Sequence, residues 1–183
     1  IITGDELVDP GSKLLPGQIF ESNSSVLISL LNADGVKNIK KFRARDSFEA
    51  ILKVFRKAVS EFDIVILTGG ISVGDYDFVN KVMAAEKVKT IFYKVKQKPG
   101  KPLFFGGKGK KYIFGLPGNP ASVVTCYYEF VRPALRCIQS HPAKEPVTLK
   151  LPLTDPVNKK PGLTHFLKAY TDLKTVTPLP DQE

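Results

Sequence analysis

The chain has 183 residues, of which 43% are hydrophobic and 25% charged, and its formal net charge is +9. This is enough for one α/β domain with a small appendage, and no apolar run approaches the ~20 residues of a membrane span, so no membrane partner is expected. The positive charge can simply serve solubility or can favour an anionic ligand, whereas nucleic acid is not expected, because the lysines are dispersed and no nucleic-acid-binding motif accompanies them.

In chain order, strand-like and helix-like segments alternate. Strands are expected at residues 1–3, 36–42, 63–68, 88–95, 102–105 and 111–116. Amphipathic helices are expected between them: over 23–34, capped by Ser22 or Asn23, after a cap at Asp46, over 76–85, and along a segment after 117–120 that Pro133 interrupts. The continuous apolar run 63–68 is typical of a strand buried on both faces of a parallel sheet. The alternation predicts a three-layer α/β/α sandwich.

The sequence changes character after His141. Residues 141–183 contain several prolines and two strand-like runs but no helical period. We therefore predict an α/β domain over 1–140, followed over 141–183 by a linker and an incomplete β domain, because two strands rarely stand alone. The opening "IITGDEL" resembles a strand entered halfway, which indicates a fragment of a longer protein.

The cysteines and histidines offer no catalytic pattern. Cys126 and Cys137 lie on one predicted helix, roughly 16 Å apart, too far for a disulfide, and are expected to be buried thiols in a reducing compartment. His141 and His165 lack metal-ligand spacing and are expected to be structural or exposed.

Four polar segments follow predicted strands or lie in loops nearby: "TGDEL", "TGGISVGDYD", "KPGKP" and "LPGNPAS". In an open α/β sheet, ligands bind outside the carboxyl ends of the strands. This coincidence favours one ligand site built from all four segments.

The second segment combines bare backbone with acidic side chains. Gly69 and Gly70 would let an anion approach the peptide N–H groups, and Ser72 adds a hydroxyl, although glycines here can also be plain turn residues. Asp75 and Asp77 fit a Mg²⁺ site, which Asp5 and Glu6 could join, or they could cap the following helix.

The other two segments could hold anions. Lys98 and Lys101, on a loop stiffened by prolines, could clamp an oxyanion or could be ordinary solvated lysines. Gly118 and Asn119 precede a helix, whose N-terminus favours phosphate, but Asn119 or Ser122 could simply cap that helix.

Together with "GQIFESNS", these segments occur in the order and spacing of the MoeA family, and the chain resembles that family over roughly residues 1–140. These are the molybdopterin molybdenumtransferases, related to the E domain of gephyrin. The resemblance implies a molybdopterin-binding, MogA-like fold and the last step of molybdenum cofactor synthesis. There, molybdate is inserted into adenylylated molybdopterin and AMP is released with Mg²⁺ assistance.

The resemblance also implies roles for individual residues. The expected catalytic residues are Asp5, Asp77, Lys98 and Lys101, and the expected metal ligands are Asp75 and Asp77. The residues expected to bind the pterin substrate and molybdate are Thr3, Gly4, Gly69, Gly70, Ser72, Gly74, Pro102, Pro117, Gly118, Asn119 and Ser122. Further implied are a homodimer of the full-length protein, a possible adenylyltransferase partner and a cytoplasmic location.

The chain departs from the family in two ways. Two N-terminal domains are missing, and the β domain stops before a Ser-rich segment that contributes to the molybdate site. Lys168 stands where relatives often carry arginine and loses the bidentate fork. We therefore expect the fragment alone to be catalytically incomplete.

Three alternatives share the fold. A molybdopterin adenylyltransferase has a glycine loop that resembles "GGTG" where this chain has "GGIS". A nucleotide hydrolase of the same fold is disfavoured by the pair "KPGKP" and "PGNP". A non-catalytic, gephyrin-like scaffold would not need the acidic and lysine sites.

Overall fold

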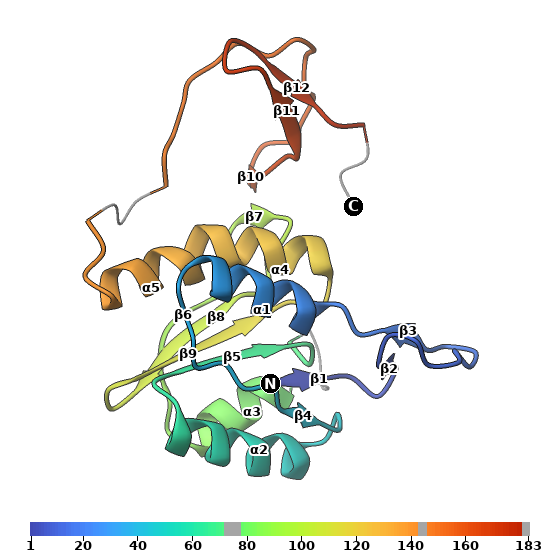
Figure 1. Cartoon of the computed structure of the whole chain (residues 1–183), viewed down its shortest axis with the longest axis vertical. Helices are drawn as coiled ribbons and strands as arrows, with labels where there is room; N and C mark the ends of the chain where they lie inside the picture. The colour runs from blue at the N-terminus through green and yellow to red at the C-terminus, as the bar shows by residue number, and fades with distance from the viewer. Residues whose placement is uncertain (72–77, 143–145, 181–183) are drawn as a thin grey trace.

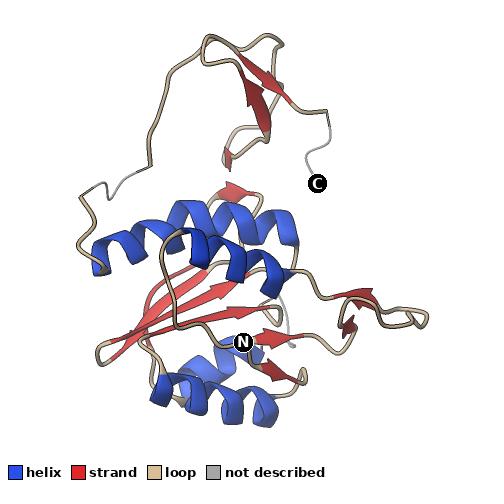
Figure 2. Cartoon of the chain, in the orientation of Figure 1, coloured by secondary structure: helices blue, strands red, loops and turns tan. Residues whose placement is uncertain are grey.

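The computed structural model describes residues 1–71, 78–142 and 146–180. Its body is a six-stranded sheet with the strand order β4-β1-β5-β9-β8-β6. Helices α1, α4 and α5 cover one face of this sheet, and α2 and α3 cover the other (Figures 1 and 2). This three-layer α/β/α arrangement confirms the predicted fold class.

The sheet is mostly parallel. Its strands are β4 (Arg43–Ala44), β1 (Ile2–Thr3), β5 (Ile64–Thr68), β9 (Lys111–Leu116), β8 (Phe104–Lys108) and β6 (Lys89–Tyr93). β4, β1, β5 and β9 run parallel, and β8 is antiparallel to both of its neighbours. In β5, Val65 and Leu67 pack into the core on one face, whereas Ile64 and Ile66 pack against the core on the other. This two-sided burial explains why the strand is continuously apolar.

The helices follow the predicted order. They are α1 (Asn23–Ala33), α2 (Phe48–Glu61), α3 (Phe78–Ala85), α4 (Pro120–Cys126) and α5 (Arg132–Ile138). The interruption expected at Pro133 takes the form of a π-helical stretch, η1 (Tyr127–Val131), that joins α4 to α5. Because proline has no N–H to donate to the preceding turn, the hydrogen bonding rearranges just before it.

Three local predictions are wrong. The segment 36–42 is not a strand, and pairing with β1 begins only where the Ile2 N–H donates to Phe42 O (2.9 Å) and continues in β4. The cap of α2 is Ser47, whose Oγ accepts from Ala50 N (3.3 Å). Asp46, the predicted cap, instead accepts a hydrogen bond from Thr3. β8 begins two residues later than the predicted strand at 102–105.

Two small substructures leave the body. β2 (Leu7–Val8) pairs with β3 (Ile19–Phe20) in an arm that projects to one side (Figure 1). Beyond α5 the chain forms β10 (Thr164–His165), which pairs with β7 (Gln97–Lys98), and the hairpin β11 (Ala169–Thr171) with β12 (Val176–Pro178).

The first strand-like run of the C-terminal segment, residues 147–153, forms no strand. Its one pairing is an isolated bridge between Leu153 and Val176. Cys126 is buried as predicted, whereas Cys137 is exposed on α5, so the expectation of two buried thiols is wrong for Cys137. His141 is exposed and His165 is half-buried in β10. Over the described ranges, no helix is both long and apolar enough to cross a membrane.

Candidate functional site

The carboxyl ends of the neighbouring parallel strands β1, β5 and β9 meet at one edge of the sheet. The loops that follow them pack backbone against backbone there. A Cβ placed on Gly69 would lie 2.0 Å from Thr3 O, and a Cβ on Gly118 would lie 3.8 Å from the Gly69 Cα. Gly69 also has a φ of +82°, which side-chain-bearing residues rarely adopt. Three of the four predicted segments therefore converge at this edge of the sheet, here called the glycine edge after Gly69 and Gly118.

Two carboxylates lie beside this contact. The Asp46 N–H donates to Asp5 Oδ1 (3.2 Å), and Thr3 Oγ1 donates to Asp46 Oδ1 (3.1 Å). Asp46 Oδ1 also lies 3.5 Å from the Cβ position of Gly70. Asp5 lies at this edge beside Asp46. Asp46 was missed, and the signal that could have found it is its position two residues after the edge strand β4.

The first turn of α1 closes the same edge from one face of the sheet. Asn23 is only 6% exposed, and its Nδ2 donates to Gly118 O (2.8 Å). Ser22 occupies the predicted cap position of α1 but makes no side-chain capping hydrogen bond, and Asn23, the other proposed cap, bonds across to Gly118. The role of Asn23 was missed. The signal that could have found it is an amide side chain on the first turn of a helix, placed to face the "LPGNPAS" loop.

Glu21 takes over the capping role and anchors this turn. Its carboxylate is 1% exposed and accepts from Ser24 N (2.7 Å), the Ser24 hydroxyl and Lys41 Nζ (2.9 Å). Burial alone would raise the pKa of Glu21, but the hydrogen bonds from Ser24 and Lys41 outweigh burial and lower that pKa below its ordinary value. The buried carboxylate is thus held ionised and paired.

The loop over 97–102, which carries Lys98 and Lys101 and is here called the lysine loop, is held against α4. Gln97 Nε2 donates to Pro99 O (3.1 Å) and Gly100 O (3.4 Å). A Cβ on Gly100, whose φ is +91°, would lie 2.6 Å from Cys126 Sγ. Burial raises the pKa of the Cys126 thiol to about 12, and the thiol accepts from Gln97 Nε2 (3.6 Å) and donates to Gly100 O (3.7 Å), so it supports this loop as a neutral group. The loop leaves Lys98 and Lys101 exposed.

The start of α4 joins the lysine loop to the glycine edge. Asn119 Oδ1 accepts from Ser122 N (3.1 Å), which makes Asn119 the cap of the helix. Ser122 is buried, and its carbonyl lies 3.6 Å from the Cβ position of Gly100. Of the remaining predicted residues, Gly4 and Pro117 are buried and Pro102 is half-buried. The described parts of all four segments therefore form one continuous region.

Four predicted site residues lie outside the described residues: Ser72, Gly74, Asp75 and Asp77. Over the described ranges, no three His, Cys, Asp or Glu side chains gather as metal ligands. A cavity of about 290 Å³ lies elsewhere, lined by Ile1, Phe42, Asp63 and Ile64 among others near the start of β5. It does not belong to the edge where the four segments meet.

Comparison with known proteins identifies the fold family. A family model described as "Probable molybdopterin binding domain" matches residues 1–137. The chain belongs to this family. The molybdopterin-binding domain thus includes the glycine edge, the lysine loop and α4, and the resemblance to molybdenum cofactor proteins is confirmed.

Several relatives of this molybdopterin-binding domain carry functional names. The molybdopterin molybdenumtransferase of Staphylococcus epidermidis is 34% identical over 173 residues, which cover 94% of this chain and 41% of that protein. The protein of the same name from Nostoc is 40% identical over 137 residues, 73% of this chain and 31% of that protein. The chain therefore spans less than half the length of these relatives.

Solved structures agree with the fold. The molybdopterin biosynthesis protein MoeA of Pyrococcus horikoshii superposes with a TM-score of 0.82 at 29% identity, covering 98% of this chain and 44% of that one. The molybdopterin biosynthesis enzyme MoaB of Thermus thermophilus shares the fold at 16% identity, with a TM-score of 0.52 over 76% of this chain and 94% of that chain.

Proposed function

We propose that this molybdopterin-binding domain works within a molybdopterin molybdenumtransferase, which inserts molybdate into adenylylated molybdopterin and releases AMP. The observation that carries the proposal is the continuous region formed by the glycine edge and the lysine loop. Both substrates are anions. The close backbone packing of Gly69 against Thr3 and Gly118 fixes the loops that would surround the ligand, and Lys98 and Lys101 supply exposed positive charge in the same region.

Mg²⁺ is proposed to bind at the same edge. Asp5 and Asp46 offer carboxylate oxygens beside Gly70, and Mg²⁺ is typically held by one or two carboxylates together with substrate phosphates. Asp75 and Asp77 are proposed as further ligands. When bound, the ion would offset the phosphate charge of the substrate. Lys98 and Lys101 would orient the oxyanion, and Ser122 would line its site.

The wider organisation is also proposed. Residues 1–140 would form the molybdopterin-binding domain, and residues 141–183 a linker and part of a β domain. The full-length protein would be a cytoplasmic homodimer that receives its substrate from an adenylyltransferase. The fragment alone would not insert molybdenum, because it spans 41% of the S. epidermidis relative.

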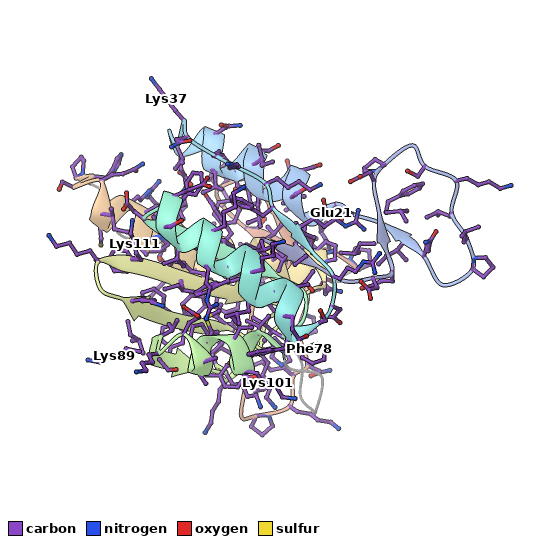
Figure 3. All side chains as sticks on the ribbon, turned by 90° about the horizontal axis from the view of Figure 1, so that it is seen from below. Glu21, Lys37, Phe78, Lys89, Lys101 and Lys111 are labelled. Carbon is purple, nitrogen blue, oxygen red and sulfur yellow. The ribbon has the colours of Figure 1, made fainter. Side chains whose placement is uncertain are left out.

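The function is tested by titrating AMP with molybdate and Mg²⁺ into the chain. Lys101→Ala removes one charge from the lysine loop and is expected to weaken binding about tenfold or more, the effect of losing one charge-assisted hydrogen bond. Lys37→Ala is the matched control, because Lys37 and Lys101 lie on opposite sides of the molecule (Figure 3). Equal effects of the two substitutions, or no binding by the unmodified chain, would contradict the proposal.

A further inference from the structure

Two buried polar atoms at the glycine edge lack hydrogen-bond partners. Across the described residues, Asn23 Oδ1 and Thr68 Oγ1 are the buried side-chain oxygens or nitrogens without one. The two residues are 6% and 1% exposed. Leaving a buried polar atom unpaired costs stability, so such atoms usually have a bound partner.

The strand pattern places Thr68 on the same face of the sheet as Asn23. Ile64 and Ile66 of β5 pack against the core that lies under α1 and α4, and side chains alternate along a strand, so Thr68 points to this face as well. Its neighbour in register, Leu116, belongs to the same core.

Asn23 and Thr68 approach the same point from two elements. Asn23 opens α1 and bonds to Gly118 O. Gly118 lies against Gly69, the residue that follows Thr68. Both unpaired atoms therefore lie near the contact between the first turn of α1 and the end of β5.

The chemistry of Asn23 decides what these unpaired atoms can bind. Because its partner Gly118 O only accepts, the amide must turn its NH₂ toward Gly118, and Oδ1 is left as an acceptor. An ionised phosphate or molybdate oxygen also only accepts and cannot satisfy Oδ1. A ring edge that carries amino and N–H groups can satisfy it, and the Thr68 hydroxyl can donate to or accept from the same edge.

We propose that Asn23 and Thr68 form a neutral subsite that binds the amino and ring N–H edge of the pterin, apart from the lysine loop that binds the anionic groups. This inference rests on the proposed function, because it assigns the pterin part of the same substrate. In this arrangement Asn23 and Thr68, under α1, would bind the hydrogen-bond donors of the pterin, and the lysine loop would bind the anionic groups.

Thr68→Val gives the sharpest test, because it removes the hydroxyl and keeps the shape of the side chain. The midpoint of thermal unfolding is expected to stay or rise, since an unpaired buried hydroxyl is lost. The affinity for free pterin, measured by fluorescence titration, is expected to fall about tenfold. Thr68→Ser keeps the hydroxyl and is expected to bind pterin within about threefold of the unmodified chain. Undiminished pterin binding by Thr68→Val would overturn the inference and leave the hydroxyl paired with a trapped water.

Asn23→Leu and two ligands separate this inference from the proposed function. Asn23→Leu is expected to weaken pterin binding at least as much as Thr68→Val does. A chain that binds AMP with molybdate and Mg²⁺ but not pterin would overturn the subsite and leave the proposed function standing. A chain that binds neither ligand would overturn both.

Discussion

At the residue level, Gly69 sets the closest approach in the site, and its replacement gives a direct test of that packing. Gly69→Ala is expected to lower the free energy of unfolding by at least about 3 kcal/mol, because its φ of +82° disfavours a side chain and the new Cβ would lie 2.0 Å from Thr3 O. Gly11 has a similar φ of +89° but nothing within 4 Å.

Gly11→Ala is therefore the matched control and is expected to lose only about 1 kcal/mol, the part due to backbone strain. Urea unfolding measures the free energy of unfolding of both variants. If Gly69→Ala and Gly11→Ala lose equal free energy of unfolding, the loops after β1 and β5 can move apart easily, and their close packing at the glycine edge does not constrain the site.

Glu21 makes the stability of the first turn of α1 depend on pH. Its pKa in the folded protein lies below the ordinary value of 4.5, so the stability it adds is complete above that pH and is lost as the pH falls through the lowered pKa. Glu21→Gln is expected to cost about 1–3 kcal/mol at neutral pH, and this difference should shrink toward pH 3. Urea unfolding across this range measures it.

Glu49→Gln removes one carboxylate from an exposed position on the first turn of α2 and serves as the control. It is expected to stay within about 0.5 kcal/mol of the unmodified chain. A gap between Glu21→Gln and the unmodified chain that stays constant as the pH falls would show that Glu21 acts through packing and not through its charge.

The residues of the site were only partly predictable from the sequence. Glycines after an apolar run identify backbone that must approach something closely, so Gly69 and Gly118 could be named in advance. Asn23 and Asp46 could not, because Asn and Asp near a helix start are usually caps. Their role depends on Gly118 and Thr3, which lie 95 and 43 residues away along the chain, so only the folded structure reveals it.

At the level of elements, the short strand β10 fastens the lysine loop to the C-terminal segment. The Thr164 N–H donates to Lys96 O (2.8 Å), and the Phe166 N–H donates to Lys98 O (2.9 Å). Thr164→Pro removes the first donor and is expected to speed amide hydrogen exchange in residues 95–101, because the loop loses part of its support.

Thr154→Pro is the matched control, since it also follows a leucine and also removes one backbone donor, to Val176 O (3.0 Å), away from the lysine loop. It is expected to leave exchange in 95–101 unchanged. If both variants behave alike, β10 does not support the loop.

Elements buried on both faces were the easiest to predict. β5 and β9 are rich in apolar residues because each contacts both cores; β9 matches its expected segment, and β5 begins one residue later than expected. The edge strand β4 was misplaced because two residues at a sheet edge need no apolar period. The pairing of β10 with β7 leaves no trace in local sequence, since a two-residue strand has no measurable alternation.

At the level of the whole molecule, the stability of the chain resides in the body. The buried hydrophobic residues run from Ile1 to Leu135, and no residue in 146–180 is buried. Both apolar cores share the single six-stranded sheet, so the two faces are expected to unfold together in one transition. Residues 146–180 would contribute to the site through β10 without contributing to the core.

A chain shortened to residues 1–142 tests this division. Its free energy of unfolding is expected to lie within about 0.5 kcal/mol of the unmodified value, because apolar burial dominates stability and the removed segment buries no side chain fully. Leu116→Ala, a fully buried position in β9, is the contrast and is expected to lose about 2–5 kcal/mol. Urea unfolding followed by circular dichroism measures both. A shortened chain that unfolds as readily as Leu116→Ala would show that the C-terminal segment belongs to the cooperative core and would contradict the proposed division at residue 140.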